Sequence, residues 1–262
     1  MRPIIPCHSA VMNPAAKFVS KKLKPLIKRA RTIIHGTKDL ATKLSRVNID
    51  TRRKYFIVTG DVVAFYPNIP LKQCMEVITK MYEQHLWETE DPMDPKVEIL
   101  LKVFSTCMKV GNSRLVCKFQ NQYYEQLRGL AMGVASSPDL ANLWGAFFED
   151  KVNIVEDPNV PLYGRYIDDC IALVYAESAE HAVAYLDNRI KFDGCTILWS
   201  ATQSQPFLDM YLFINEDNAL EHKPFQKAHN HKERIPWISH HPLTVKTVVF
   251  GPTLQWHLKV VP

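Results

Sequence analysis

The sequence predicts an α+β protein in which an antiparallel sheet is covered by helices on one face. Three observations carry this prediction. Strand-like apolar segments alternate with helical ones along the 262 residues, and short turns between neighbouring strands favour antiparallel pairing. The 47% of hydrophobic residues supply a sizeable core without a disulfide or metal. Because no repeat or low-complexity linker interrupts the sequence, we expect a single compact body.

Six helices are predicted from apolar residues at helical spacing. The first spans residues 13–33, and Pro25 is expected to kink it. The second begins at the Thr37 cap. The other four cover residues 71–86, 95–110, 137–152 and 178–190.

The strands are predicted from β-branched and aromatic runs bounded by turn residues. Residues 55–63 form one strand, and residues 162–175 form a hairpin with its turn at Asp168–Asp169. A second hairpin is expected over 114–126, turning at Gln120–Asn121. Two more strands are predicted over 195–200 and 206–213, before a His- and Pro-rich tail from Glu221. The histidines of this tail match no familiar zinc spacing, so a polar loop is favoured over a metal cluster.

Positive charge is concentrated at the start of the chain. Residues 1–60 contain 14 Lys and Arg against 2 Asp and Glu, whereas residues 61–262 contain 18 against 25. Such a segment suits a polyanionic partner, because bound lysines release phosphate counterions. A merely solvated helix face is the other interpretation. The lysines that we expect to contact nucleic acid are Lys17, Lys21, Lys22, Lys24 and Lys28.

The cysteines and the apolar runs exclude several classes of protein. The six cysteines are scattered without a Cys-x-x-Cys pair, which indicates neither a zinc ribbon nor a disulfide framework. A reducing intracellular compartment fits this pattern. No apolar run is long enough to cross a bilayer, so we expect a soluble protein without a membrane partner.

The strongest chemical signal is a set of three carboxylates at strand ends. Asp168 and Asp169 follow Tyr166 at the tip of an apolar hairpin, and Asp61 ends the strand over 55–63. Each aspartate alone is ordinary turn or cap chemistry. Together they could hold two Mg²⁺ ions, with Mn²⁺ as a substitute, that bridge phosphate oxygens. Such ions would activate a primer 3′-hydroxyl and steady the leaving pyrophosphate.

A glycine-bearing loop lies between these carboxylates in the sequence. It contains Gln126, Gly129, Met132 and Gly133, and it runs into a helix at Ser137-Pro138. Glycines allow the backbone to approach a nucleotide or template base closely, and a helix start offers N–H donors. The order and spacing of these residues are more specific than those of a generic glycine loop.

These motifs resemble the palm region of a reverse transcriptase. Asp61 with Tyr66 resembles the first palm motif, residues 126–138 resemble the Gln-x-x-Gly-x-x-Met-Gly-x-x-x-Ser-Pro motif, and residues 166–169 resemble the Tyr-x-Asp-Asp motif. The Arg-Pro-Ile at residues 2–4 resembles a segment of the fingers, and the Phe-Leu-Asp at 207–209 resembles the one that follows the palm in Penelope-like and related non-LTR retroelement enzymes. The resemblance covers residue 2 to about residue 213.

The resemblance implies a ferredoxin-like palm and a role for each matching residue. Asp61 and Asp168 would bind Mg²⁺ with Asp169 close by, and Tyr66 would block a ribose 2′-hydroxyl and so select dNTPs. Tyr166 would contact nucleic acid, and Arg2 would contact the triphosphate. The nucleotide and template pocket would be shaped by Gln126, Gly129, Met132 and Gly133.

By this resemblance, residues 1–54 are partial, basic fingers, residues 55–220 are the palm, and residues 221–262 are a palm–thumb connection with a truncated, rudimentary thumb. The chain resembles a fragment as much as a working enzyme. The expected function is RNA-directed DNA synthesis on an RNA template with a DNA primer and dNTPs, in the nucleus if the element is eukaryotic. The alternatives are an inactive remnant that only binds nucleic acid and an RNA-dependent RNA polymerase, against which Tyr66 argues. The oligomeric state is left open.

Overall fold

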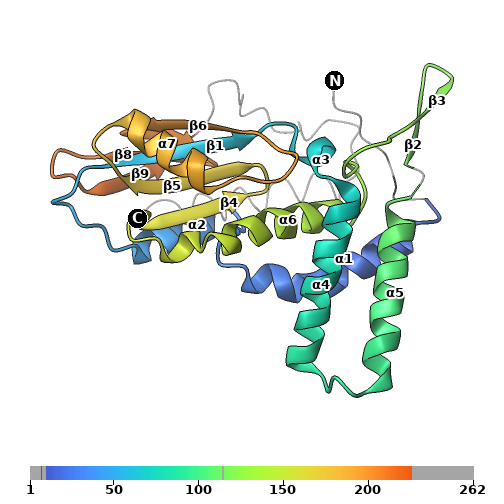
Figure 1. The fold of residues 1–262 in the computed structure, drawn as a ribbon. Coiled ribbons are helices and arrows are strands. Elements are labelled where there is room, and N and C mark those ends of the chain that lie inside the picture. Colours follow the sequence, from blue (N-terminus) through green and yellow to red (C-terminus); the bar gives the residue numbers. More distant parts are fainter. Residues whose placement is uncertain (1–6, 8–9, 114, 226–262) are drawn as a thin grey trace, which may run out of the picture. The chain divides into compact units, whose positions relative to one another are not determined.

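The structure, a computed structural model, describes residues 7, 10–113 and 115–225 (Figure 1). Arg2 and residues 226–262, with most of the predicted truncated thumb, lie outside the described residues. The chain divides into two compact units, Met1–Gln203 and Ser204–Pro262. The expectation of a single compact body is therefore wrong. The division into segments 1–54, 55–220 and 221–262 stays a prediction.

The first unit is built around a four-stranded antiparallel sheet with the order β4-β5-β1-β6. Its strands are β1 (Tyr55–Val62), β4 (Leu162–Tyr166), β5 (Asp169–Tyr175) and β6 (Ile197–Thr202). β1 and β5 form strands because they are rich in β-branched and aromatic residues, which fit a pleated surface. The strands predicted from sequence are confirmed here, with ends shifted by up to two residues. The turn between β4 and β5 lies one residue earlier than predicted, between Tyr166 and Asp169.

Both faces of this sheet are buried at its centre. Phe56 and Val58 belong to the main core, yet Ile57, on the opposite face of β1, is fully buried as well. The same holds for Ala172 and Leu173 of β5. The reason is visible in the sequence, because continuous apolar runs rather than alternating ones mark strands that are covered on both sides.

The predicted helices are all present in the first unit. They are α1 (Asn13–Arg29), α2 (Thr37–Arg46), α4 (Leu71–Thr89), α5 (Pro95–Gly111), α6 (Ser137–Lys151) and α7 (Ala179–Arg189). The sequence did not predict two short elements, α3 (Phe65–Asn68) and the 3₁₀ turn η1 (Ile154–Glu156). α1 continues through Pro25 and ends at Arg29, four residues earlier than expected.

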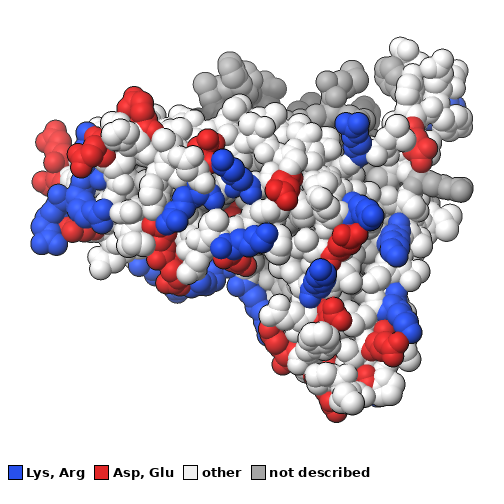
Figure 2. Space-filling view, in the orientation of Figure 1, with Lys and Arg blue, Asp and Glu red and all other residues white. Residues whose placement is uncertain are grey.

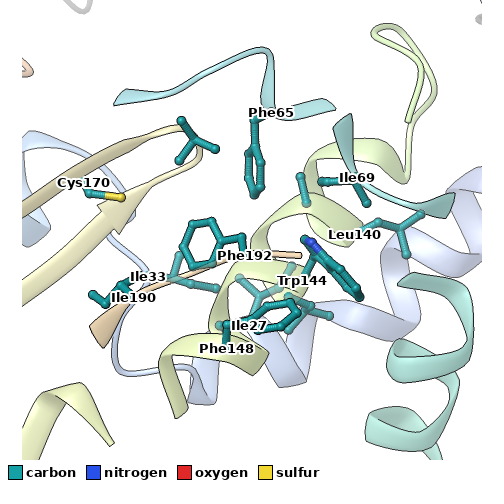
Figure 3. Packing of buried hydrophobic residues seen from close by; sticks show 14 of the residues in the cluster. Ile27, Ile33, Phe65, Ile69, Leu140, Trp144, Phe148, Cys170, Ile190 and Phe192 are labelled. Carbon is teal, nitrogen blue, oxygen red and sulfur yellow. The ribbon is translucent and has the colours of Figure 1, made fainter. Parts of the chain in front are cut away.

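Helix α6 carries the centre of the core. Figure 3 shows Leu140, Trp144 and Phe148 of α6 together with Phe65 from α3 and Phe192 from the segment after α7. The ring centroids of Trp144 and Phe148 are 4.9 Å apart, and those of Phe65 and Phe192 are 5.9 Å apart. This packing joins α3, α6 and the segment after α7 beneath the sheet end that holds the three carboxylates.

Two helices and a hairpin complete the unit. α4 and α5 form an antiparallel pair (Figure 1), in which the rings of Tyr82 and Phe104 stack with centroids 4.1 Å apart. β2 (Val116–Phe119) pairs with β3 (Gln122–Glu125). Gln120 and Asn121 both have positive φ, as a two-residue hairpin turn between right-handed strands requires. The predicted hairpin is confirmed.

The second unit holds a three-stranded antiparallel sheet. Its strands are β7 (Ser204–Phe207), β8 (Met210–Ile214) and β9 (Leu220–Pro224), in that order. The prediction of one strand over 206–213 is wrong, because Leu208 has a φ of 51° and the chain turns there. Residues 221–224 belong to β9 rather than to a loop-like tail. In the described part of the chain, no helix is long and apolar enough to cross a membrane.

Candidate active site

Asp61 and Asp169 face each other across the sheet. β1 and β5 pair in a register that sets Asp61 directly opposite Asp169, with Tyr166 and Leu198 as the next residues on either side. Directly opposed residues have Cβ atoms about 4.5–5.5 Å apart on the same face. All four side chains of this row are exposed. The sheet therefore presents two carboxylates side by side to solvent.

The turn beside this row carries the third carboxylate. Tyr166 pairs with Asp169, so the two turn residues are Ile167 and Asp168. The prediction of a turn at Asp168–Asp169 is thus wrong by one residue. The Val62 N–H donates a hydrogen bond of 3.0 Å to the Asp168 carbonyl oxygen. This bond ties the turn to the end of β1, immediately after Asp61.

Ile167 has a strained backbone. Its φ is 57°, in the left-handed region where a β-branched residue is a conformational outlier. Such strain costs about 1–2 kcal/mol and persists only where the surrounding contacts hold it in place. Strained residues cluster at functional sites. The strained Ile167 lies between the exposed Tyr166 and the half-buried Asp168.

Two carboxylates of this site, those of Asp61 and Asp168, take part in none of the ion pairs seen in the described part of the chain. Like charges directly opposite each other destabilise a sheet. A bound cation would remove this repulsion.

The donor set fits Mg²⁺ in its chemistry. Carboxylate oxygens are the ligands that this ion prefers. Within the described ranges, no three His, Cys, Asp or Glu side chains gather into a ready-made metal centre. Mg²⁺ does not need such a cage, because it is usually bound by one or two carboxylates together with substrate phosphates. Asp61, Asp168 and Asp169 would be its ligands.

Tyr66 lies near the carboxylates, in α3. Burial raises the pKa of its hydroxyl to about 12, and the nearby Asp168 and Asp139 carboxylates add to this shift. The hydroxyl therefore stays protonated at every physiological pH. Its neighbour Phe65 is only 2% exposed and packs in the core, as expected of an aromatic without a direct role.

The glycine-bearing loop is anchored to α3 rather than left open. The Leu130 N–H donates to the Tyr66 carbonyl oxygen at 2.8 Å. Gly129 has a φ of 72°, and a Cβ at this position would lie 2.4 Å from the Pro67 carbonyl oxygen. Gly129 therefore allows the loop to pack closely against the chain's own backbone at Pro67.

The other loop residues lie at different depths. The Gln126 side-chain amide donates to the carbonyl oxygens of Arg128 at 2.8 Å and Leu130 at 3.2 Å, which closes the loop on itself. Met132 is half-buried, and Gly133 is exposed with a φ of 107°. The loop thus positions Tyr66 from one side, and its role toward a nucleotide stays a prediction.

The lysines of α1 form an exposed stripe. Lys17, Lys21, Lys24 and Lys28 recur at spacings of three and four residues on the exposed side of the helix, a run of about 16 Å. Lys22 is half-buried and lies over the Phe18 ring. Figure 2 shows Lys and Arg interspersed with Asp and Glu on the face that it draws.

One lysine of the stripe has a partner inside the chain. The Lys24 ammonium lies 2.8 Å from an Asp139 carboxylate oxygen, and the Ser20 hydroxyl donates to the other oxygen at 2.5 Å. The Asp139 side chain is only 6% exposed. Lys24 therefore neutralises a buried carboxylate at the start of α6. The remaining exposed lysines are better placed to contact a phosphate backbone.

Sequence reasoning missed Arg165 and its partner Glu149. Both side chains are fully buried, and they form an ion pair beneath the turn at Ile167–Asp168. A signal for Arg165 was present, because an arginine inside an apolar strand is almost never buried without a partner. No spacing rule pointed to Glu149, which lies on another element.

The comparisons with known proteins bear on the fold. No protein-family model and no curated protein sequence matches the chain. Telomerase from Candida tropicalis in complex with a TWJ fragment of telomeric RNA is similar in structure, with a TM-score of 0.59 and 14% identity over 96% of this chain and 42% of that chain. Telomerase from Candida albicans with a TWJ fragment of telomeric RNA gives a TM-score of 0.58 and 15% identity over 84% and 40%.

Telomerase from Candida tropicalis without ligand gives a TM-score of 0.57 and 12% identity over 81% of this chain and 40% of that chain. The chain spans about two fifths of the length of these telomerase chains. At such identities the likeness concerns the fold alone. The chain therefore has a mixed α/β fold with antiparallel sheets that is similar to the fold of these telomerase chains.

Proposed function

We propose that this chain is the palm of an RNA-directed DNA polymerase of the retroelement type, extending a DNA primer on an RNA template with dNTPs. The observation that carries the proposal is the cross-strand pair Asp61 and Asp169, with Asp168 on the adjoining turn. The similarity of the fold to telomerase supports it independently.

The connectivity of the sheet agrees with a palm. When the inserted α3, α4, α5, β2–β3 hairpin and η1 are left aside, β1 is followed by α6, the β4–β5 hairpin, α7 and β6, in the spatial order β4-β5-β1-β6. This order supports the proposal of a palm with the β-α-β-β-α-β connectivity of ferredoxin-like folds. The arrangement brings the end of β1 beside the β4–β5 turn, which is where the three aspartates lie.

Each group of residues in the site would have a separate role in the reaction. Two divalent ions, when bound, would polarise the phosphoryl oxygens and increase the acidity of the primer hydroxyl. Asp61, Asp168 and Asp169 would hold these ions, and Tyr66 would limit the space beside the ribose. The exposed Lys17, Lys21 and Lys28 would contact the phosphate backbone.

The finer assignments belong to the same proposal. The motif at residues 207–209 favours a Penelope-like or related non-LTR retroelement, whose product would act in the nucleus of a eukaryotic cell. Gln126, Gly129, Met132 and Gly133 would shape the nucleotide and template pocket. Mg²⁺ would be the natural ion, with Mn²⁺ as a substitute.

Template–primer extension tests the proposal. The intact chain, Asp168→Asn and a control, Asp187→Asn on the exposed side of α7, are given an RNA or DNA template, a DNA primer and Mg²⁺ or Mn²⁺. We expect the chain and the control to extend the primer and Asp168→Asn to be slower by on the order of 100-fold or more, since a lost metal ligand removes several kcal/mol of charge stabilisation. Extension that is unchanged in Asp168→Asn would contradict the proposal.

The same assay separates the competing functions. Salt-sensitive binding to RNA–DNA hybrids without incorporation at any Mg²⁺ or Mn²⁺ concentration would indicate an inactive remnant. A preference for rNTPs would indicate an RNA-dependent RNA polymerase. Tyr66→Ala is expected to accept rNTPs more readily than the intact chain, and Tyr66→Phe, which keeps the ring, is expected to exclude them.

A further inference from the structure

Arg165 is a buried cation directly beneath the candidate active site. It lies in β4, one residue before the exposed Tyr166, and both its side chain and that of Glu149 in α6 are 0% exposed. A buried ion pair is weak evidence for stability, because the desolvation of two charges offsets their attraction. A contribution to stability therefore does not explain why this ion pair lies beneath the candidate active site.

All five N–H groups of the Arg165 guanidinium have acceptors. Nε and Nη2 donate to the two carboxylate oxygens of Glu149, the latter at 3.2 Å. Nη2 also donates to the Asn142 carbonyl oxygen at 2.8 Å, and Nη1 donates to Asn142 Oδ1 at 3.3 Å. The fifth bond runs from Nη1 to the Ile167 carbonyl oxygen at 2.9 Å. The guanidinium thus fixes one turn residue relative to two residues of α6.

The surroundings are shaped for this side chain. A Cβ at Gly145 would lie 2.4 Å from the Arg165 Cζ, so the glycine leaves room for the guanidinium on α6. The Phe65 and Phe192 rings have centroids 5.9 and 5.7 Å from the same atom. Glycine inside a helix costs about 0.5–1 kcal/mol relative to alanine. Gly145 therefore lowers the stability of α6 slightly, but it leaves space for the planar guanidinium of Arg165.

The turn is anchored on both of its sides. Arg165 holds the carbonyl oxygen of Ile167, whose φ of 57° is strained, and the Val62 N–H holds the carbonyl oxygen of Asp168. The first anchor leads to α6 and the second to the end of β1. Two anchors on consecutive peptides leave the Asp168 backbone little freedom relative to Asp61.

We propose that Arg165 is a positioning residue. With Glu149 and Asn142, it fixes the Ile167–Asp168 turn so that the Asp168 carboxylate is held beside Asp61 for a divalent cation. This inference rests on the proposed function to the extent that these aspartates bind the cation. Partners that orient metal ligands typically contribute about 10- to 100-fold to metal affinity.

Mn²⁺ binding to the full chain tests the inference without relying on catalysis. Free Mn²⁺ is measured by electron paramagnetic resonance in the intact chain, Arg165→Lys and Asp168→Asn, and the Tm of each protein is recorded. Arg165→Lys keeps the charge but cannot form the forked set of bonds. The control is Arg189→Lys, because Arg189 also pairs with a buried carboxylate, that of Asp157.

We expect the dissociation constant for Mn²⁺ to rise about ten-fold or more in Arg165→Lys and to stay unchanged in Arg189→Lys. Intact affinity in Arg165→Lys, with affinity lost in Asp168→Asn, would overturn the positioning role and leave the proposed function standing. If the intact chain binds no Mn²⁺, or if Asp168→Asn binds it normally, the metal assignment itself fails.

A second variant covers the case in which Arg165→Lys does not fold at the assay temperature. Asn142→Ala removes one side-chain acceptor from a half-buried position and keeps the ion pair. Weaker Mn²⁺ binding at an unchanged Tm would support the inference. Wild-type affinity in this variant would overturn it.

Discussion

Asp61 and Asp169 occupy directly opposite positions on β1 and β5, at an end of the strands where both residues are exposed. Two like charges in this relationship destabilise the fold that holds them. Active sites often contain such arrangements, in which residues needed for the reaction lower the stability of the fold.

The repulsion predicts that removing one charge stabilises the metal-free protein. Asp61→Asn is expected to raise the free energy of unfolding by about 0.2–1 kcal/mol in the presence of a chelator. The gain should shrink or reverse when Mg²⁺ is added, because the ion stabilises only the intact pair. Urea unfolding with and without Mg²⁺ measures this, and Asp187→Asn serves as the control. An equal effect in both buffers would show that the pair does not bind the ion.

Tyr66 predicts a specific loss of stability at alkaline pH. Burial, with Asp168 and Asp139 nearby, raises its pKa to about 12, whereas a tyrosine in an unfolded chain titrates near 10. Between pH 10 and 12 the folded state therefore binds more protons than the unfolded state, and the free energy of unfolding falls as the pH rises.

In Tyr66→Phe this contribution is absent. The stability advantage of the intact chain over Tyr66→Phe should be constant below about pH 9 and should decrease by about 2–3 kcal/mol toward pH 12. Urea unfolding at several pH values checks this, with Tyr123→Phe on the exposed β3 strand as the control. A difference that stays constant up to pH 12 would contradict the shift.

Gly129 and Gly36 form a matched pair that separates backbone strain from close packing. Both have positive φ, but a Cβ would lie 2.4 Å from the Pro67 carbonyl oxygen at Gly129 and would meet nothing within 4 Å at Gly36. Gly36→Ala should cost about 1–2 kcal/mol through strain alone. Gly129→Ala should cost about 1–3 kcal/mol more, because the backbone must also move. Equal losses in thermal or urea unfolding would contradict the anchoring of the loop on α3.

Lys21 and Lys24 of α1 are expected to have different roles, the first in nucleic-acid binding and the second in stability. Lys21→Ala should leave stability within about 0.5 kcal/mol of the intact chain and reduce the slope of log affinity against log salt for nucleic acid by about 1. Lys24→Ala should lower the free energy of unfolding by about 1–2 kcal/mol, because Asp139 loses its cation, and should change the slope less. Salt-dependent binding and urea unfolding measure both. The reverse pattern would contradict the assignment of Lys24 to the fold.

The sequence alone predicted the helices and strands that depend on local residue patterns. The helices over α4, α5, α6 and α7 follow from apolar spacing, and the β2–β3 hairpin follows from turn residues that tolerate positive φ. The predicted antiparallel sheet with helices is part of a mixed α/β fold that is similar to that of the telomerase structures. The carboxylates were found because charged residues at the ends of apolar strands stand out.

The errors have a common physical cause, which is that tertiary contacts override local preference. Turn chemistry favours aspartate over isoleucine, so the turn was expected at Asp168–Asp169. The structure places it on Ile167 and Asp168 because bonds from Arg165 and Val62 hold it there. Neither bond can be predicted from local sequence. The register of Asp61 with Asp169 was likewise hidden, since it depends on how β1 and β5 slide past each other.

The most direct test of the central claim is a double-mutant cycle on single-turnover incorporation of one dNTP. The rates of the intact chain, Asp61→Asn, Asp168→Asn and the double variant are compared on an RNA template with a DNA primer. If the two carboxylates act as one unit, each single variant loses nearly all activity and the double variant is no slower than either. Rates that fall multiplicatively, or single variants that incorporate at the intact rate, would contradict a shared catalytic site.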